Sequence, residues 1–272
     1  MTVALLVGRL LRRGVGGTLA LVAGILVFQL LEPLIADSMG GAQGLQSLVE
    51  TLPPGMQAIA RLDPQFVALS GLAGFLSFGY THPLYLVLIS SAMVGFAARS
   101  LAGEIDRGTI AVALARPISR RSIYAARVAG LVALSAALSL AGTAGTLIGV
   151  LVARPEGELT YAHLVQLTMT AALLAWAIGG LTLWASAGSS TSGRVVGMAT
   201  AVLVISYFVD YFADVWSVLE PLAPYSLFNY FDPAHALVNG AIRPLDAAVL
   251  SLSGLIGVVA GALIFDRRDL PV

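Results

Sequence analysis

The chain has 272 residues, of which 58% are hydrophobic and 11% are charged. A soluble domain is about half apolar and about a quarter charged, so this composition excludes a soluble domain and predicts a polytopic membrane protein. The net charge is zero, which argues against a nucleic-acid partner, and the absence of cysteine excludes disulfides and cysteine chemistry. All 15 basic residues are arginine, and since a Walker A loop needs lysine, the chain cannot hydrolyse ATP through that motif.

The first predicted elements are an entry segment and a span. Residues 1–14 place Arg9, Arg12 and Arg13 among leucines, which is typical of a short amphipathic segment on the cytoplasmic face. Residues 15–36 are apolar over a longer stretch than a signal-peptide core and lack a small-x-small cleavage site. We therefore expect a first membrane span and no cleaved signal peptide.

A long connection follows over residues 37–82 and contains many turn signals. Within it, residues 45–52 have mixed polarity and residues 66–80 are apolar. The apolar stretch includes three glycines and falls short of the ~20 residues that a span needs. The pattern favours a pair of interfacial or re-entrant helices on the outer face.

Five further apolar segments predict the remaining spans. They cover residues 83–98, 122–153, 163–187, 195–216 and 245–265. The third span of the chain is longer than a bilayer requires, so we expect residues 119–127 to protrude into the cytoplasm. No internal repeat or linker divides the chain, which predicts an all-α protein with one permease domain over residues 1–272.

The arginines set the orientation of the six spans. With both termini inside, the outer side receives three arginines and the cytoplasmic side the other twelve, as the positive-inside rule requires. A seventh span over residues 66–80 would remove this bias. The outer three are Arg61, Arg154 and Arg243; the others are Arg9, Arg12, Arg13, Arg99, Arg107, Arg116, Arg120, Arg121, Arg127, Arg194, Arg267 and Arg268.

The connector over residues 101–121, between the second and third spans, has the densest charge. A single helix through it would place Leu101 and Ile105 opposite Leu114, which is poor amphipathicity, so we expect a break. Its charged residues are Glu104, Asp106, Arg107, Arg116, Arg120 and Arg121.

Turn and cap residues divide the connector. Gly108 is suited to end the incoming helix, and Thr109 to cap a short helix over residues 110–115. Pro117 then stops that helix, and Ser119 caps the third span. The sequence predicts a short helix lying on the membrane surface, with acids on one side and arginines on the other.

These residues carry a resemblance to a known family. Glu104, Gly108-Thr109, Leu114, Arg116-Pro117 and Ser119-Arg120 resemble the signature of ABC transporter permeases of the type-two exporter class, although Ala115 replaces its second leucine. Segments 222–233 and 265–270 also resemble the ends of such permeases. The resemblance implies that the short helix is a coupling helix that docks into a separate ATPase subunit. The implied coupling residues are Glu104, Asp106, Arg107, Gly108, Thr109, Leu114, Arg116, Pro117, Arg120 and Arg121. The alternative is a solvated loop whose arginines only fix topology, and Glu104 is also able to pair with an arginine of the connector.

Two acids within spans are further candidates for the pathway or a subunit interface. Asp210 lies in the fifth span, and Glu32 lies near the outer end of the first. A carboxylate inside a membrane is expensive unless it has a partner or water, so each is either functional or hydrated near the surface.

Other patterns carry no chemistry. The histidines at 82, 163 and 235 are too scattered to predict a metal site, and we expect no cofactor. Segment 188–193 lacks the nucleophile-elbow spacing. Glycines at 142, 145 and 149, and at 254, 257 and 261, predict close helix packing.

The resemblance therefore implies a permease of the cytoplasmic membrane that works as two copies, or with a similar permease, together with two ATPase subunits. Two alternatives stay open. An intramembrane enzyme would need paired catalytic groups, which Asp210 alone does not provide. The other alternative couples ATP hydrolysis to signalling or assembly at the outer face, for which the long connection leaves room.

Overall fold

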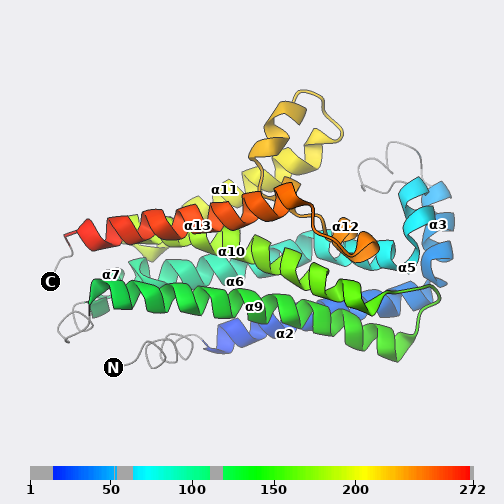
Figure 1. Cartoon of the computed structure of the whole chain (residues 1–272), viewed down its shortest axis with the longest axis horizontal. Helices are drawn as coiled ribbons and strands as arrows, with labels where there is room; N and C mark the ends of the chain where they lie inside the picture. Colours follow the sequence, from blue (N-terminus) through cyan, green and yellow to red (C-terminus); the bar gives the residue numbers. More distant parts are fainter. Residues whose placement is uncertain (1–14, 52, 54–63, 111–118, 270–272) are drawn as a thin grey trace.

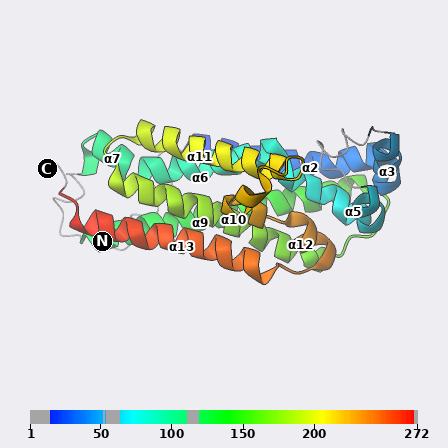
Figure 2. The same cartoon turned by 90° about the horizontal axis from the view of Figure 1, so that it is seen from above.

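The computed structural model describes residues 15–51, 53, 64–110 and 119–269, which form helices and no strand. Six helices are long and apolar enough to cross a membrane, which confirms the all-α polytopic prediction. They lie side by side in an elongated bundle (Figures 1 and 2). They are α2 (Val15–Ser38), α6 (Pro83–Ser100), α9 (Arg120–Ala153), α10 (Leu164–Gly188), α11 (Ser192–Ala213) and α13 (Pro244–Arg267).

Local capping explains where several helices begin and end. The Leu84 amide donates to Nδ1 of His82 (3.1 Å) at the start of α6. The Ser122 amide donates to the Ser119 hydroxyl (3.1 Å), which confirms the predicted cap of α9. At the far end of α9, Arg154 adopts the left-handed conformation with φ 54° and stops the helix.

Glycines bring two pairs of helices into close contact. A Cβ atom at Gly145 of α9 would clash with the carbonyl oxygen of Leu26 in α2. A Cβ atom at Gly254 or Gly257 of α13 would similarly clash with α10, where Gly257 faces the backbone of Gly180. These contacts confirm the predicted packing role of both glycine series.

The connection between α2 and α6 contains α3 (Gly41–Thr51) and α5 (Pro64–Thr81), which pack together at the end of the bundle opposite the connector (Figure 1). The helix α5 is interrupted at Gly71, whose φ of 56° and ψ of −143° only glycine adopts easily. Beyond this break, residues 72–77 and Tyr80 are buried among the neighbouring helices. The six candidate spans do not include α5.

The connection between α11 and α13 contains the short helices η2 (Glu220–Tyr225), η3 (Phe228–Tyr230) and α12 (Pro233–Asn239), and η1 (Tyr161–His163) precedes α10. Arg243 ties this connection to α13, because it pairs with Asp232 (3.2 Å) and Asp246 (2.8 Å). The hydrogen bond to Asp246 raises the pKa of the Arg243 guanidinium. Residues 214–225 project sideways from the bundle (Figure 1).

Candidate functional site

The connector begins with a break that the sequence did not predict. The helix α6 ends at Ser100, and the short helix α7 (Ala102–Asp106) follows after Leu101, whose φ of −124° and ψ of −65° are not helical. The Ser186 hydroxyl of α10 accepts the Ala102 amide (3.0 Å) and donates to the Ala98 carbonyl (3.3 Å). In an uninterrupted helix that amide and that carbonyl would bond to each other, so the inserted hydroxyl breaks the helix.

The second break lies where the sequence predicts it. Gly108 has φ 65°, and its amide donates to the Ile105 carbonyl (2.9 Å), so it ends α7. The prediction for Thr109 is wrong in detail, since its hydroxyl donates back to the Glu104 carbonyl (3.3 Å) and Thr109 itself is helical. The rest of the predicted short helix, with Leu114, Arg116 and Pro117, lies outside the described residues.

Glu104 forms a buried ion pair with Arg127 of α9. Nη2 of Arg127 lies 2.6 Å from Oε2 of Glu104, and the two side chains are only 4% and 9% exposed. Arg127 also donates from Nε to the Ser100 carbonyl (3.0 Å). The alternative of a solvated loop is therefore wrong for Glu104, whose partner lies beyond the connector, and residue 127 is packed against α6 and α7 beside the start of the connector.

Asp106 joins the connector to α11. Its carboxylate accepts the amide (3.4 Å) and the hydroxyl (3.2 Å) of Ser192, the first residue of that helix. A carboxylate at a helix N-terminus interacts favourably with the helix dipole. Beside this contact, Ala98, Ala102 and Val195 form a small, fully buried apolar cluster. Arg107, which directly follows α7, is exposed.

The predicted docking arginines at 120 and 121 are engaged within the chain. Nη1 of Arg120 donates to the carbonyls of Asp266 (3.4 Å) and Arg268 (2.6 Å) at the end of α13. Arg121 pairs with Asp266 (3.3 Å), although its side chain is 84% exposed. Arg268 in turn donates to the carbonyls of Ala187 and Ser189, each at 2.9 Å, at the end of α10. These bonds hold the ends of α9, α10 and α13 together.

The chain matches a known protein family. The model of the ABC-2 family transporter protein matches residues 20–270, nearly the whole chain. The chain belongs to the ABC-2 family. No curated protein matches it. Membership of this family makes the chain a multi-pass transmembrane permease of an ABC transporter. Such a permease is a membrane subunit that is not itself catalytic, so the alternative of an intramembrane enzyme is set aside.

The two candidate acids of this ABC-2 permease lie away from the connector. Asp210 is only 8% exposed, which favours the buried interpretation over a hydrated surface residue. Glu32 is half-buried, and its side chain lies against Gly79 of α5. Gln29, one turn earlier in α2, was missed by sequence reasoning: it is fully buried, and its amide oxygen and nitrogen have no hydrogen-bond partner in the described part of the chain.

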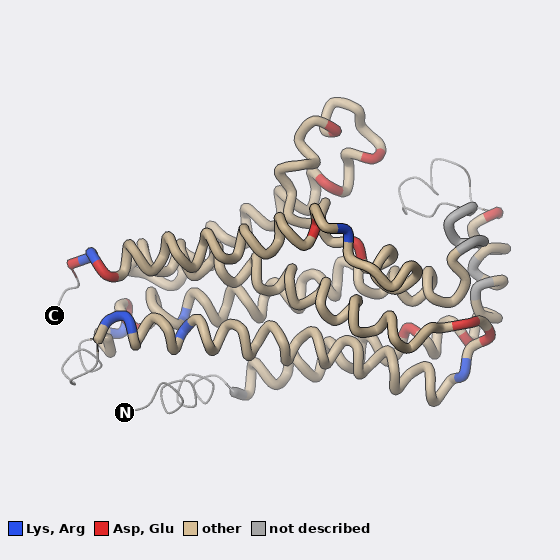
Figure 3. Tube along the Cα trace, in the orientation of Figure 1, with Lys and Arg blue, Asp and Glu red and all other residues tan. Residues whose placement is uncertain are grey.

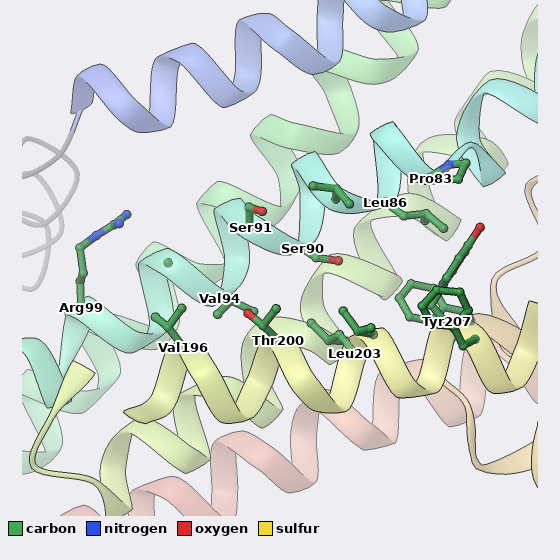
Figure 4. A pocket seen from close by; sticks show the side chains of 15 residues that line it. Pro83, Leu86, Ser90, Ser91, Val94, Arg99, Val196, Thr200, Leu203 and Tyr207 are labelled. Carbon is green, nitrogen blue, oxygen red and sulfur yellow. The ribbon is translucent and has the colours of Figure 1, made fainter. Parts of the chain in front are cut away.

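A lateral groove lies between α6 and α11, and the sequence did not predict it. It has a volume of about 480 Å³. Figure 4 shows Arg99 at one end of it and Pro83 and Tyr207 at the other. Its lining also carries the hydroxyls of Ser90, Ser91 and Thr200. The groove exists because α11 buries only Val195 and Asp210 and leaves one face of α6 uncovered.

Proposed function

We propose that this ABC-2 permease is the membrane subunit of an ATP-driven exporter and is moved through its connector by a separate ATPase subunit. The observation that supports this proposal most directly is that α7 is bonded to three spans. Glu104 pairs with α9, the Ala102 amide bonds to α10, and Asp106 caps α11. A displacement of the connector therefore acts directly on all three helices.

The charge distribution supports a cytoplasmic position for the connector. The basic residues gather at the connector end of the bundle (Figure 3). Among the described arginines, only Arg154 and Arg243 lie elsewhere. Under the positive-inside rule the connector end faces the cytoplasm, where ATP is available, and both termini are cytoplasmic in the cytoplasmic membrane. A reporter fused after Gly157 is expected to read as external.

The α6–α11 face is the best candidate for the pathway wall. Exposed large side chains on α13, such as Leu252, Ile256 and Val259, are apolar and suit contact with lipid. The groove instead presents the hydroxyls of serine, threonine and tyrosine side chains and a guanidinium, which are unfavourable toward hydrocarbon. We propose that two copies, or this chain and a similar permease, oppose these faces across a shared pathway and bind two ATPase subunits.

The resemblance to exporters implies the order of events. ATP binding closes the ATPase dimer, which pushes the connector, and α7 moves with it. The ion pair, the Ser186 contact and the Asp106 cap pass this motion to the spans. Because α11 is the least buried of these spans, it responds most, and the pathway opens outward.

Substitutions in the connector test this function. Leu114→Asp places a charge on the proposed docking helix, and Gly108→Pro is incompatible with the positive φ at that position. Both are expected to leave membrane insertion intact and to reduce co-purification of the ATPase or to uncouple ATP hydrolysis from export. Val218→Asp is the matched control, since Val218 is 82% exposed and lies far from the connector. Normal partner binding and normal export in both connector variants would contradict the proposal.

The projecting segment favours the second candidate function, in which ATP hydrolysis drives signalling or assembly at the outer face. Trp216, Val218 and Tyr225 are 64%, 82% and 86% exposed there, and they offer a surface for a protein partner. Shortening residues 215–225 separates the two functions. If this deletion abolishes the cellular function but leaves ATP-driven export by the purified complex unchanged, the second candidate is correct.

A further inference from the structure

Among the described residues that line the groove between α6 and α11, one is charged: Arg99, at the connector end. Its side chain folds back along α6 over Gly95. A Cβ atom built at Gly95 would lie only 3.1 Å from Nη1 of Arg99. Arg99 makes no ion pair within the described residues. The glycine thus leaves room for the guanidinium of Arg99, which lines the connector end of the groove.

The rest of the groove is mostly apolar. Valines and leucines of α6 and α11 form the walls, and the aromatic rings of Tyr207, Phe208 and Phe228 close the end away from the connector. Pro83 and Arg99, at opposite ends, are 16 residues apart on one helix, which corresponds to about 24 Å. No acidic residue is among the described residues of the lining. The groove is therefore elongated, apolar along its length and positively charged at one end.

We propose that this groove binds a single-chain anionic amphiphile, with its carboxylate, sulfate or phosphate head group on Arg99 and its hydrocarbon chain along α6 and α11. The proposal rests on the proposed function, since it names the class of cargo in the same pathway. A guanidinium binds such head groups by two parallel charge-assisted hydrogen bonds. The groove volume of about 480 Å³ lies within the roughly 300–1,000 Å³ of small-molecule sites.

Charge complementarity favours this ligand over direct closure by a second copy. In a two-fold contact the same elements face each other. The connector halves of α6 and α11 carry Arg99 and Arg194 and no acid. Two copies closed directly on these faces would place Arg99 against helix halves that carry no acid, whereas an anionic head group neutralises it. With the connector end cytoplasmic, the head group would sit at the inner surface of the membrane.

Photolabelling of the permease–ATPase complex in nanodiscs of zwitterionic lipid tests the proposal. The probe is a long-chain fatty acid with a photoreactive group in its chain, and the head-group controls are the matching primary alcohol and trimethylammonium compounds. We expect the carboxylate to label α6 and α11 about tenfold more strongly than the alcohol, as the loss of one charge-assisted hydrogen bond implies. Arg99→Gln should remove this difference, and Arg99→Lys should retain most of it. Arg194→Gln is the matched control, since Arg194 is an exposed arginine outside the groove lining, and it should behave like the wild type.

Several results would overturn the proposal. Equal labelling by all three probes, or full labelling of Arg99→Gln, would show that head-group charge is not recognised. Strong competition by an acidic phospholipid added to the discs would show that the ligand is a membrane lipid. Because the chain has no cysteine, Val87→Cys and Val204→Cys can be introduced on the two walls; complete disulfide formation between copies that excludes the probe would show that a second copy fills the groove.

The same experiment separates this proposal from the proposed function. If the complex forms and its ATP hydrolysis depends on the connector, but the groove shows no head-group selectivity, only the ligand assignment fails. If selective labelling occurs but no ATPase associates with the permease, the ligand assignment stands and the exporter function fails.

Discussion

The two sides of this ABC-2 permease are held together in different ways. On one side α10 and α13 touch through backbone at Gly180 and Gly257, and the Trp176 indole donates to the Ser251 carbonyl (3.1 Å). On the other side α11 contributes only Val195 and Asp210 to the buried interior. Close backbone contact resists relative motion of the two helices, because a close-packed interface has few voids and does not deform continuously. The difference indicates that α11 is the part of the bundle that moves most readily.

The polar contacts at the connector end follow the same division. Arg120 and Arg268 bond to backbone carbonyls and hold the ends of α9, α10 and α13 together. The helix α11 is joined to the connector by one carboxylate, Asp106, and by one small apolar cluster. We infer that the connector acts on the rigid group α9, α10 and α13 through Glu104. Through Asp106 it acts on α11, the movable wall of the groove.

The largest expected effect comes from breaking the buried ion pair that joins the connector to α9. Arg127→Met breaks the buried ion pair with Glu104, and we expect the free energy of unfolding to fall by roughly 3–5 kcal/mol. The midpoint of heat-induced unfolding in detergent measures it. The double variant Glu104→Gln with Arg127→Met should recover much of the loss. The control is Arg121→Met, whose pair with Asp266 is exposed and is expected to contribute at most about 1 kcal/mol. Equal midpoints for Arg127→Met and Arg121→Met would show that the buried pair is not a structural anchor.

The next largest effect should come from the contact between α10 and α13. Gly257→Leu inserts a side chain where a Cβ atom already clashes with Gly180, so we expect destabilisation by about 1–3 kcal/mol or separation of the helices. Gly197→Leu on α11 is the matched control, because no atom lies within 4 Å of a Cβ built there. Thermal unfolding of both variants compares the two sides directly. A control variant as unstable as Gly257→Leu would show that α11 is packed as tightly as α13.

A smaller effect is expected at the link between the connector and α11. Asp106→Ala removes the acceptor of the Ser192 amide and hydroxyl, and loss of such a cap typically costs about 0.5–2 kcal/mol. Hydrogen exchange at residues 192–195 should become faster, while exchange in α10 should not change. Arg107→Ala, at the exposed neighbouring residue, is the control. If exchange at the start of α11 is unchanged in Asp106→Ala, the carboxylate is not the link between connector and wall.

The sequence predicted the structural features that depend on local sequence pattern. The six spans follow from apolar length, the turn at Gly108 follows from the freedom of glycine, and the start of α9 follows from the Ser119 cap. Contacts between distant segments were missed. Nothing near Leu101 signals a break, because the hydroxyl that causes it belongs to Ser186 of another helix.

The same limit applies to the partner of Glu104 and to the groove. Arg127 lies inside an apolar span, where its charge was assigned to topology, and only the fold brings it to Glu104. The groove depends on how little α11 packs against α6, which periodicity does not report. Its hydroxyls at Ser90, Ser91 and Thr200 were the available signal, but serine and threonine also occur at ordinary contacts between membrane helices.

The smallest expected effect concerns Asp210, one of only two buried residues of α11. Asparagine keeps its shape and hydrogen-bonding capacity, so Asp210→Asn should change stability by no more than about 1 kcal/mol. Asp210→Leu removes both the charge and the hydrogen bonding, and we expect it to insert readily but to weaken assembly or transport more than asparagine does. Co-purification of two differently tagged copies measures assembly, and export by the complex measures transport. If both variants assemble and transport like the wild type, the burial of Asp210 has no functional role, and the movable wall works without a polar contact at its outer end.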